Sequence, residues 1–259
     1  SSLGYPKSAN IGEKVTLSKL KTVTQTNKIF VGWFTSAEGA RNLDKKLAYN
    51  ADAIKGDTEF FAGWIDLSSE EFLVNAAEND PIHPVGKNLQ AFGVFASDIN
   101  ISDESGGLRF YGHISSALIE RLSKFSSKEV SYGMVLQIAS NTSGPLTSAT
   151  SEGYLQDGKS IVVTAKKNYG EFKFLGSGSY IVFTSLAANI PLEDAKTDIA
   201  ARGFITYYDV NGIRHAFYYT NTEENTPDMS LKASGVTSNL YKCAEKMYAS
   251  ASDLEKNWL

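Results

Sequence analysis

The sequence predicts a mainly β protein of the α+β class, with a small β-rich N-terminal lobe and a larger, sandwich-like β lobe. Three observations lead to this prediction. Short apolar and aromatic runs alternate with turn residues through most of the 259 residues. Helical spacing occurs at a few places only, one of them near the C-terminus. The segment Asn79–Lys87 contains two prolines and a glycine, and separates two regions of different pattern.

Residues 1–66 form the predicted small lobe. The apolar-aromatic runs Lys28–Phe34 and Glu59–Ile65 are flanked by turn residues, so each predicts a strand. Each run contains a Gly-Trp pair near its end. A large ring at the end of a short strand can close a small core, which favours packing for Trp33 and Trp64. Partial exposure of these rings to a ligand is the alternative.

Residues 67–87 form the predicted helical connector and linker. Ser68 and Glu71 have the spacing of a capping box, in which the two side chains satisfy the first free N–H groups of a helix. Phe72, Leu73 and Ala76 then follow at helical spacing. The pattern predicts a short helix before the proline-containing linker.

Residues 88–259 form the predicted larger lobe. Its apolar runs predict strands at 89–101, 108–114, 129–139, 159–166, 170–175, 180–187 and a hairpin within 198–220. A short helix is expected after the second strand, because its apolar positions share one face: Ile114, Leu118, Leu122 and Phe125. The C-terminal helix has one apolar stripe, formed by Leu240, Cys243, Ala244, Met247, Ala251, Leu254 and Trp258.

The hairpin is predicted to turn at Asn211-Gly212, a pair that suits a two-residue type I′ turn. That turn places Asp209 opposite Arg214, a favourable pair of opposite charges, and Tyr208 opposite His215. Both faces of the hairpin are then rich in aromatic residues. Only one face of a sandwich strand needs to be buried, so the other is free for a ligand unless the C-terminal helix covers it.

Composition and motifs argue against several classes of function. The net charge is −4, so no basic field points to nucleic acid. No apolar run reaches the ~18 residues of a membrane-spanning helix. The single cysteine, Cys243, excludes an internal disulfide and a CxxC site. The chain start lacks the features of a signal peptide and reads as a mature segment.

The same scan finds no signature of catalysis. No serine-hydrolase elbow, phosphate loop or dinucleotide motif occurs, and the three histidines lack metal-ligand spacing. We therefore expect a protein that is not an enzyme and has no cofactor and no metal. The 29 acidic residues leave a glycosidase pair of carboxylates open, since such a pair has no fixed spacing. A calcium ion on surface carboxylates also stays open.

The N-terminal lobe resembles a known repeat. Gly32-Trp33-Phe34-Thr35, Gly56-Asp57-Thr58 and Trp64 match, in order, the pattern of the Listeria–Bacteroides repeat, also called the internalin-type B repeat. The match covers about residues 12–66. It implies a β-grasp-like module of secreted and surface proteins whose tryptophans pack the core. The repeat's opening strand has no clear counterpart here, and Lys28 stands where the family has a tyrosine.

The larger lobe, over about residues 88–245, resembles a β-rich module of clostridial and gut-bacterial surface proteins, often found beside carbohydrate-active domains. The matching residues are Gly107-Leu108-Arg109-Phe110, Val130–Val135, Asn189–Leu192, Lys196–Tyr207 and Asn211-Gly212. The pairing of two such lobes is similar to the starch-adherence modules of gut Ruminococcus amylosomes. These resemblances imply a secreted or cell-surface protein, with neighbouring modules of a surface complex as partners.

We therefore expect a non-catalytic carbohydrate-binding module, with starch, an α-1,4-glucan, as the first candidate ligand. Tyrosine offers a large contact area at low entropic cost, and neighbouring polar side chains can bind sugar hydroxyls. The alternative is a structural or adhesive protein-interaction module of the cell surface. The candidate glycan-binding residues are Tyr207, Tyr208, Tyr218, His215, Asp209, Asn211, Arg214, Tyr154 and Tyr169.

Overall fold

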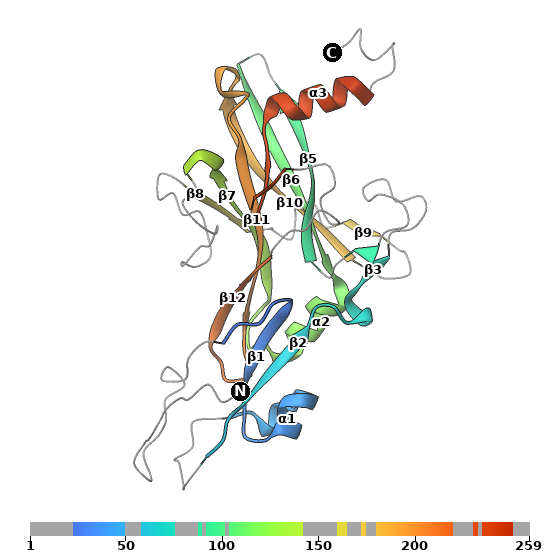
Figure 1. Cartoon of the computed structure of the whole chain (residues 1–259), viewed down its shortest axis with the longest axis vertical. Coiled ribbons are helices and arrows are strands. Elements are labelled where there is room, and N and C mark those ends of the chain that lie inside the picture. Colours follow the sequence, from blue (N-terminus) through green and yellow to red (C-terminus); the bar gives the residue numbers. More distant parts are fainter. Residues whose placement is uncertain are drawn as a thin grey trace. The chain divides into compact units, whose positions relative to one another are not determined.

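A computed structural model describes residues 23–49, 58–75, 88–89, 92–101, 104–141, 160–164, 172–174, 180–219, 230–232 and 235–250. Within these residues the chain forms strands in four sheets and three α-helices (Figure 1). The prediction of a mainly β protein of the α+β class is confirmed.

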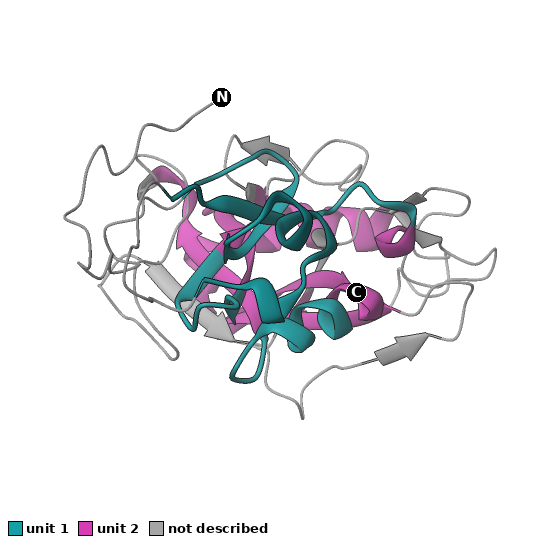
Figure 2. Cartoon of the chain, turned by 90° about the horizontal axis from the view of Figure 1, so that it is seen from below, with its two compact units in different colours: residues 1–70, 119–130, 206–216 teal, residues 71–118, 131–205, 217–259 magenta. Residues whose placement is uncertain are grey.

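The chain divides into two compact units (Figure 2). Unit 1 comprises residues 1–70, 119–130 and 206–216, and unit 2 comprises 71–118, 131–205 and 217–259. The units therefore do not follow the three consecutive segments 1–66, 67–87 and 88–259 expected from the sequence. Unit 1 takes two pieces from the region assigned to the larger lobe: the end of a helix and the tip of a hairpin.

Unit 1 is built on an antiparallel pair of strands, β1 (Lys28–Phe34) and β2 (Phe61–Asp66), as predicted. Phe30 lies opposite Trp64, and the register shifts between Phe30 and Gly32, which is a bulge in β1. The short helix α1 (Ala37–Asn42) begins after Ser36, whose hydroxyl accepts the N–H of Gly39. The 3₁₀ turn η2 (Lys45–Leu47) follows.

The predicted helix after residue 68 is wrong. The chain makes a single 3₁₀ turn, η3 (Glu70–Phe72), and then strand β3 (Val74–Asn75), which pairs with β4 (Asn88–Leu89). The expected capping box does not form, because the N–H of Ser68 donates to Oδ1 of Asp66 (3.0 Å) instead of to Glu71; the hydroxyl of Ser68 donates to the same atom (2.6 Å). Residues 76–87, with the rest of the predicted connector and linker, lie outside the described residues.

Unit 2 contains most of the strand residues, in two larger sheets. The order in the first sheet is β5 (Phe92–Ile101), β6 (Ser105–Ser115), β10 (Tyr180–Pro191) and β9 (Phe172–Phe174). The order in the second is β13 (Ser230–Lys232), β14 (Gly235–Ser238), β11 (Ile199–Tyr208), β7 (Ser131–Ile138) and β8 (Ser160–Thr164), with β12 (Arg214–Tyr218) paired to β11. The last residues of β11 and the first of β12 belong to unit 1.

The two sheets of unit 2 pack on each other through aromatic rings. Tyr132 of β7 meets Phe183 of β10 edge to face, with ring centroids 5.2 Å apart. Gly112 of β6 leaves room for the same ring, since a Cβ there would lie 2.4 Å from Cζ of Phe183. Contact between the inner faces of two sheets agrees with the sandwich-like arrangement expected for this region.

Two longer helices occur where the sequence predicts them. Helix α2 (Ser116–Phe125) buries Leu118, Leu122 and Phe125. Helix α3 (Leu240–Ser250) packs against β5 and β6 and buries Leu240 and Cys243, whereas Met247 is 42 % exposed. The predicted apolar stripe of α3 is therefore only partly buried. Its later members, Ala251, Leu254 and Trp258, lie outside the described residues.

Candidate functional site

The turn of the β11–β12 hairpin differs from the predicted type I′ turn. The N–H of Gly212 donates to the carbonyl of Asp209 (3.0 Å), and the N–H of Asp209 donates to the carbonyl of Ile213 (2.9 Å). A type I′ turn requires a positive φ at both central residues. Gly212 has a φ of 78°, but Asn211 is not among the residues with positive φ. The loop therefore has three residues, 210–212, with glycine in the left-handed position at its end.

Asp209 explains why the longer turn forms. Its Oδ1 accepts the backbone N–H groups of Asn211 and Ile213, both at 2.9 Å. Its Oδ2 lies 2.7 Å from Nε2 of His215. Aspartate is common in turns because its carboxylate can accept the backbone N–H of the residue two positions later. The carboxylate is nearly buried, with 2 % of the residue exposed.

The longer turn shifts the register by one residue from the prediction. Tyr207 lies opposite His215, and their rings stack with centroids 5.6 Å apart and planes 27° apart. Tyr208 lies opposite Arg214 instead of His215. The predicted pairing of Asp209 with Arg214 is likewise wrong, since Asp209 bonds to His215. A shift of one residue moves each side chain to the other face of its strand.

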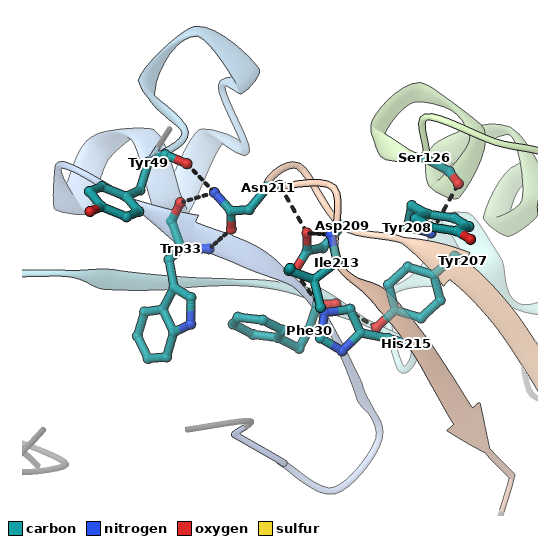
Figure 3. Close-up of polar contacts among 10 residues, drawn as sticks. All are labelled: Phe30, Trp33, Tyr49, Ser126, Tyr207, Tyr208, Asp209, Asn211, Ile213 and His215. Atoms are coloured by element: carbon teal, nitrogen blue, oxygen red, sulfur yellow. Dashed lines mark hydrogen bonds and ion pairs between the residues drawn. The ribbon is translucent and has the colours of Figure 1, made fainter. Parts of the chain in front are cut away.

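The hairpin tip, residues 209–213, docks against β1 within unit 1 (Figure 3). The N–H of Val210 donates to the carbonyl of Val31 (2.9 Å). Asn211 accepts the N–H of Trp33 at Oδ1 (2.7 Å) and donates from Nδ2 to the carbonyls of Trp33 (3.2 Å) and Tyr49. The side chain of Asn211 therefore bonds both backbone groups of Trp33, as a neighbouring strand does.

Tyr207 adds a further link between the hairpin and β1. Its hydroxyl donates to the carbonyl of Phe30 at 2.5 Å. The residue is 3 % exposed, and burial is the main reason that the pKa of Tyr207 is raised; the nearby carboxylate of Asp209 raises it further. This hydroxyl stays protonated and acts as a structural donor.

Glycine is required in both Gly-Trp pairs because other side chains approach the backbone closely. At Gly32, where φ is 132°, a Cβ would lie 2.4 Å from Cγ2 of Val210 and 2.7 Å from Oδ1 of Asn211. At Gly63, a Cβ would lie 2.3 Å from Cε2 of Phe34. The first glycine admits the hairpin tip, and the second admits a core ring.

Three partly exposed rings surround Phe30, which is 6 % exposed. Phe30 meets Trp33, Trp64 and His215 edge to face, with centroids 5.5, 5.4 and 5.5 Å away. Both tryptophans are half-buried, and the side chain of His215 is 14 % exposed. We call Trp33, Trp64 and His215 the aromatic patch. Figure 3 shows Trp33, Phe30 and His215 side by side.

The aromatic patch also presents polar atoms. In the part of the chain that the structure describes, the indole N–H groups of Trp33 and Trp64 and Nδ1 of His215 have no hydrogen-bond partner. All three residues are partly exposed. Asp209 accepts from Nε2 of His215, which leaves Nδ1 of the neutral imidazole as an acceptor. The patch thus combines apolar rings with two donors and one acceptor.

The sequence-predicted site residues are only partly brought together. Tyr207 and Asp209 are buried and offer no surface to a ligand, and Asn211 is engaged with Trp33 and Tyr49. Tyr208 and Arg214 are half-buried in unit 1, and Nζ of Lys128 lies 4.9 Å from the centroid of the Tyr208 ring.

The remaining candidates lie elsewhere. Tyr218 belongs to unit 2, where it packs on Phe204 and beneath the guanidinium of Arg202. Tyr154 and Tyr169 lie outside the described residues. The sequence favoured core packing for Trp33 and Trp64, with partial exposure as the alternative, and the structure shows both half-buried. The repeated Gly-Trp pair at the end of two neighbouring strands was the available signal for the patch.

The arrangement is chemically suited to recognition. Asp209 fixes the orientation of His215, as an acid does in many catalytic pairs. No hydroxyl or thiol of a described residue hydrogen-bonds to His215. A search of the described residues finds no group of three or more His, Cys, Asp or Glu side chains that could hold a metal ion. What the patch offers is a rigid aromatic surface with polar edges.

Comparisons with known proteins return no match from family models, curated proteins or solved structures. The two resemblances drawn from sequence motifs therefore remain predictions. Among the described helices, none has both the length and the apolar character needed to cross a membrane.

Proposed function

We propose that this protein is a non-catalytic carbohydrate-binding module that holds a glycan on the aromatic patch of unit 1. The observation that supports the proposal is the patch itself: Trp33 and Trp64 held at fixed angles around Phe30, beside an oriented histidine. Sugar rings have apolar faces that pack on aromatic rings, and hydroxyl rims that need donors and acceptors. Rings fixed before binding lose little entropy when a ligand arrives.

The polar edges of the patch match the rim of a sugar. The two indole N–H groups can donate to hydroxyl oxygens, and Nδ1 of His215 can accept a hydroxyl proton. Tyr208 and Arg214 are the predicted residues that retain partial exposure in unit 1, and they supply further contacts in this proposal. Three buried or engaged side chains hold the residues of the patch in place. Tyr207 bonds to Phe30, Asp209 bonds to His215, and Asn211 bonds to Trp33.

Starch is the glycan we propose first, and a secreted or cell-surface location goes with it. Both follow from the resemblance of the two halves to modules of gut-bacterial surface proteins. Turnover of a polysaccharide by the pure protein, lost on mutation of a pair of carboxylates, would contradict the non-catalytic part of the proposal.

The first experiment is co-sedimentation of the pure protein with insoluble starch, cellulose and xylan. We expect retention on starch and elution by soluble maltooligosaccharides. No retention on any of the three polysaccharides, together with tight binding of a protein partner, would favour the structural or adhesive alternative instead.

The second experiment locates the site with matched variants. Trp33→Ala and Trp64→Ala remove half-buried rings of the patch, and each is expected to weaken binding by at least ~10-fold, as for the aromatic centre of an interface. Trp33→Phe and Trp64→Phe retain a ring as controls for folding, and thermal unfolding verifies every variant. If Tyr208→Ala abolishes binding while the folded tryptophan variants bind normally, the glycan lies at the predicted tyrosine site instead.

A further inference from the structure

Asn211 holds the hairpin tip to β1 through both ends of its side-chain amide. Oδ1 accepts the N–H of Trp33 at 2.7 Å, and Nδ2 donates to the carbonyl of Trp33 at 3.2 Å and to that of Tyr49 (Figure 3). Both amide protons are therefore used. No other residue type of this size supplies an acceptor and two donors in this geometry, so the docking depends on the amide.

Asn211 is also followed by Gly212, and this is the only Asn-Gly dipeptide in the 259 residues. Asparagine before glycine is prone to deamidation, because the absence of a side chain lets the next backbone nitrogen reach the amide carbon. The nitrogen of Gly212 loses its proton and bonds to Cγ of Asn211. The Cγ–Nδ2 bond breaks, ammonia leaves, and water then opens the succinimide ring to aspartate or isoaspartate.

Docking of the hairpin tip hinders the reaction at both reacting groups, the backbone nitrogen of Gly212 and the side-chain amide of Asn211. The N–H of Gly212 donates to the carbonyl of Asp209 at 3.0 Å, which opposes loss of its proton. The side-chain amide of Asn211 is directed at Trp33 and Tyr49. The backbone N–H of Asn211 donates to Oδ1 of Asp209. Both bonding patterns must break before the ring can close.

We propose that Asn211 is a modification site whose deamidation is gated by docking of the hairpin tip. The reaction is slow while the tip is docked and fast once the tip leaves β1. The product does not dock again, because aspartate presents an oxygen where Nδ2 faced the carbonyls of Trp33 and Tyr49. Isoaspartate in addition lengthens the backbone of the turn by one carbon. Deamidation therefore fixes unit 1 in an opened state.

The first test compares the whole chain in native buffer with the same chain unfolded in urea, both mildly alkaline. Peptide mapping by mass spectrometry follows the peptide that contains residues 211 and 212. We expect Asn211 to deamidate at least ~10-fold more slowly in the native chain, since reaction requires local opening. Equal rates in the two states overturn the proposal, and this comparison needs no variant.

The second test uses two aspartate variants in native buffer. Asp209→Ala removes acceptors of Asn211 and His215 and loosens the turn, so Asn211 should deamidate faster than in the wild type. Asp66→Ala removes a carboxylate that bonds to Ser68 elsewhere in unit 1, and is expected to leave the rate unchanged. If Asp209→Ala does not accelerate the reaction, or both variants do so equally, docking at the tip is not the gate.

The third test examines the product through Asn211→Asp. Its melting temperature should fall below that of the wild type, and the emission of its tryptophans should shift to longer wavelength as Trp33 loses its support. A variant with unchanged melting temperature and emission would dock normally, which contradicts an irreversible opening.

Discussion

At the scale of single residues, Gly32 is the point where the backbone of β1 meets the hairpin tip. Its φ of 132° is in a region that residues with a side chain rarely adopt, and a Cβ at this position would overlap Val210 and Asn211. Glycine is therefore required in the first Gly-Trp pair because the hairpin tip packs against it, although Trp33 and Asn211 are 178 residues apart in sequence. The same approach explains why β1 is bulged at this position.

The Gly32→Ala variant is expected to lose about 2–4 kcal/mol of unfolding free energy, from backbone strain and overpacking together. Gly212→Ala is the matched control, because its φ is also positive, at 78°, yet no atom lies within 4 Å of the added carbon. The control should lose only the smaller strain contribution, of about 1 kcal/mol. Urea unfolding measures both, and equal losses would show that contact with Val210 is unimportant.

Tyr207 gives the protein a specific sensitivity to alkali. Burial raises the pKa of Tyr207 in the folded state above that of tyrosine in the unfolded chain, about 10. Its contribution to stability is therefore complete below pH ~10 and declines as the pH rises further, since only the unfolded chain can release the proton. Above that pH the wild type should lose up to about 1.4 kcal/mol more per pH unit than Tyr207→Phe.

Unfolding free energies of the wild type and Tyr207→Phe, measured from neutral pH to strongly alkaline pH, check this prediction. At neutral pH the variant should be less stable by about 1 kcal/mol, because the bond to the carbonyl of Phe30 is lost. Parallel pH profiles for the two proteins would mean that the hydroxyl ionises as readily in the folded state as in the unfolded chain.

At the scale of elements, the β11–β12 hairpin is organised by Asp209. One oxygen of the carboxylate closes the three-residue turn, and the other orients the histidine of the aromatic patch. The hairpin tip therefore docks as a rigid piece, and its position fixes one ring of the patch. The sequence suggested a simpler two-residue turn because Asn-Gly by itself favours one.

The substitution Asp209→Asn separates the two roles of this side chain. The amide oxygen can still accept the N–H groups of Asn211 and Ile213, whereas Nδ2 cannot accept from His215. We expect Asp209→Asn to lose about 1–2 kcal/mol and Asp209→Ala about 2–4 kcal/mol, because the alanine variant leaves three donors without their partner. The nuclear magnetic resonance signals of the His215 ring should change in both variants. An alanine variant as stable as the asparagine variant would contradict the turn-closing role.

At the scale of the whole molecule, unit 1 is discontinuous in sequence. Its strands β1 and β2 come from the first 70 residues, whereas its other two segments are residues 119–130 and residues 206–216, which include the hairpin tip. Phe30, Trp33 and Val31 all bond to the hairpin through their backbone groups. We therefore expect the first 70 residues to need contacts with the hairpin tip to reach the stability of unit 1.

The fragment 1–87 is therefore expected not to fold cooperatively by itself, although the sequence resemblance implies an independent repeat. Circular dichroism and urea unfolding of this fragment should show a broad transition or none, whereas the full chain unfolds cooperatively. A synthetic hairpin peptide covering residues 199–219 should restore structure, and the same peptide carrying Asn211→Ala should do so less well. A fragment as stable as unit 1 in the full chain would show that the hairpin tip is dispensable.

The local patterns of the sequence by themselves determined the class and many of the elements. The apolar runs predict eight of these elements at their observed places, because apolar and aromatic residues favour burial whatever their neighbours: β1, β2, β5, β6, β7, β10, α2 and α3. The helix expected after Ser68 failed for a local reason of another kind, since Asp66 accepts the backbone N–H of Ser68 that a capping box gives to Glu71.

Only the tertiary structure decided the register of the hairpin and the composition of the site. Asn211 turns with its side chain on Trp33 and Tyr49 because those carbonyls are present, and no short-range pattern contains that information. The resulting one-residue shift buries Tyr207 and Asp209 and brings His215 to Phe30, the ring that Trp33 and Trp64 also contact. Local preferences select elements, whereas contacts between residues far apart in sequence decide which side chains are left for function.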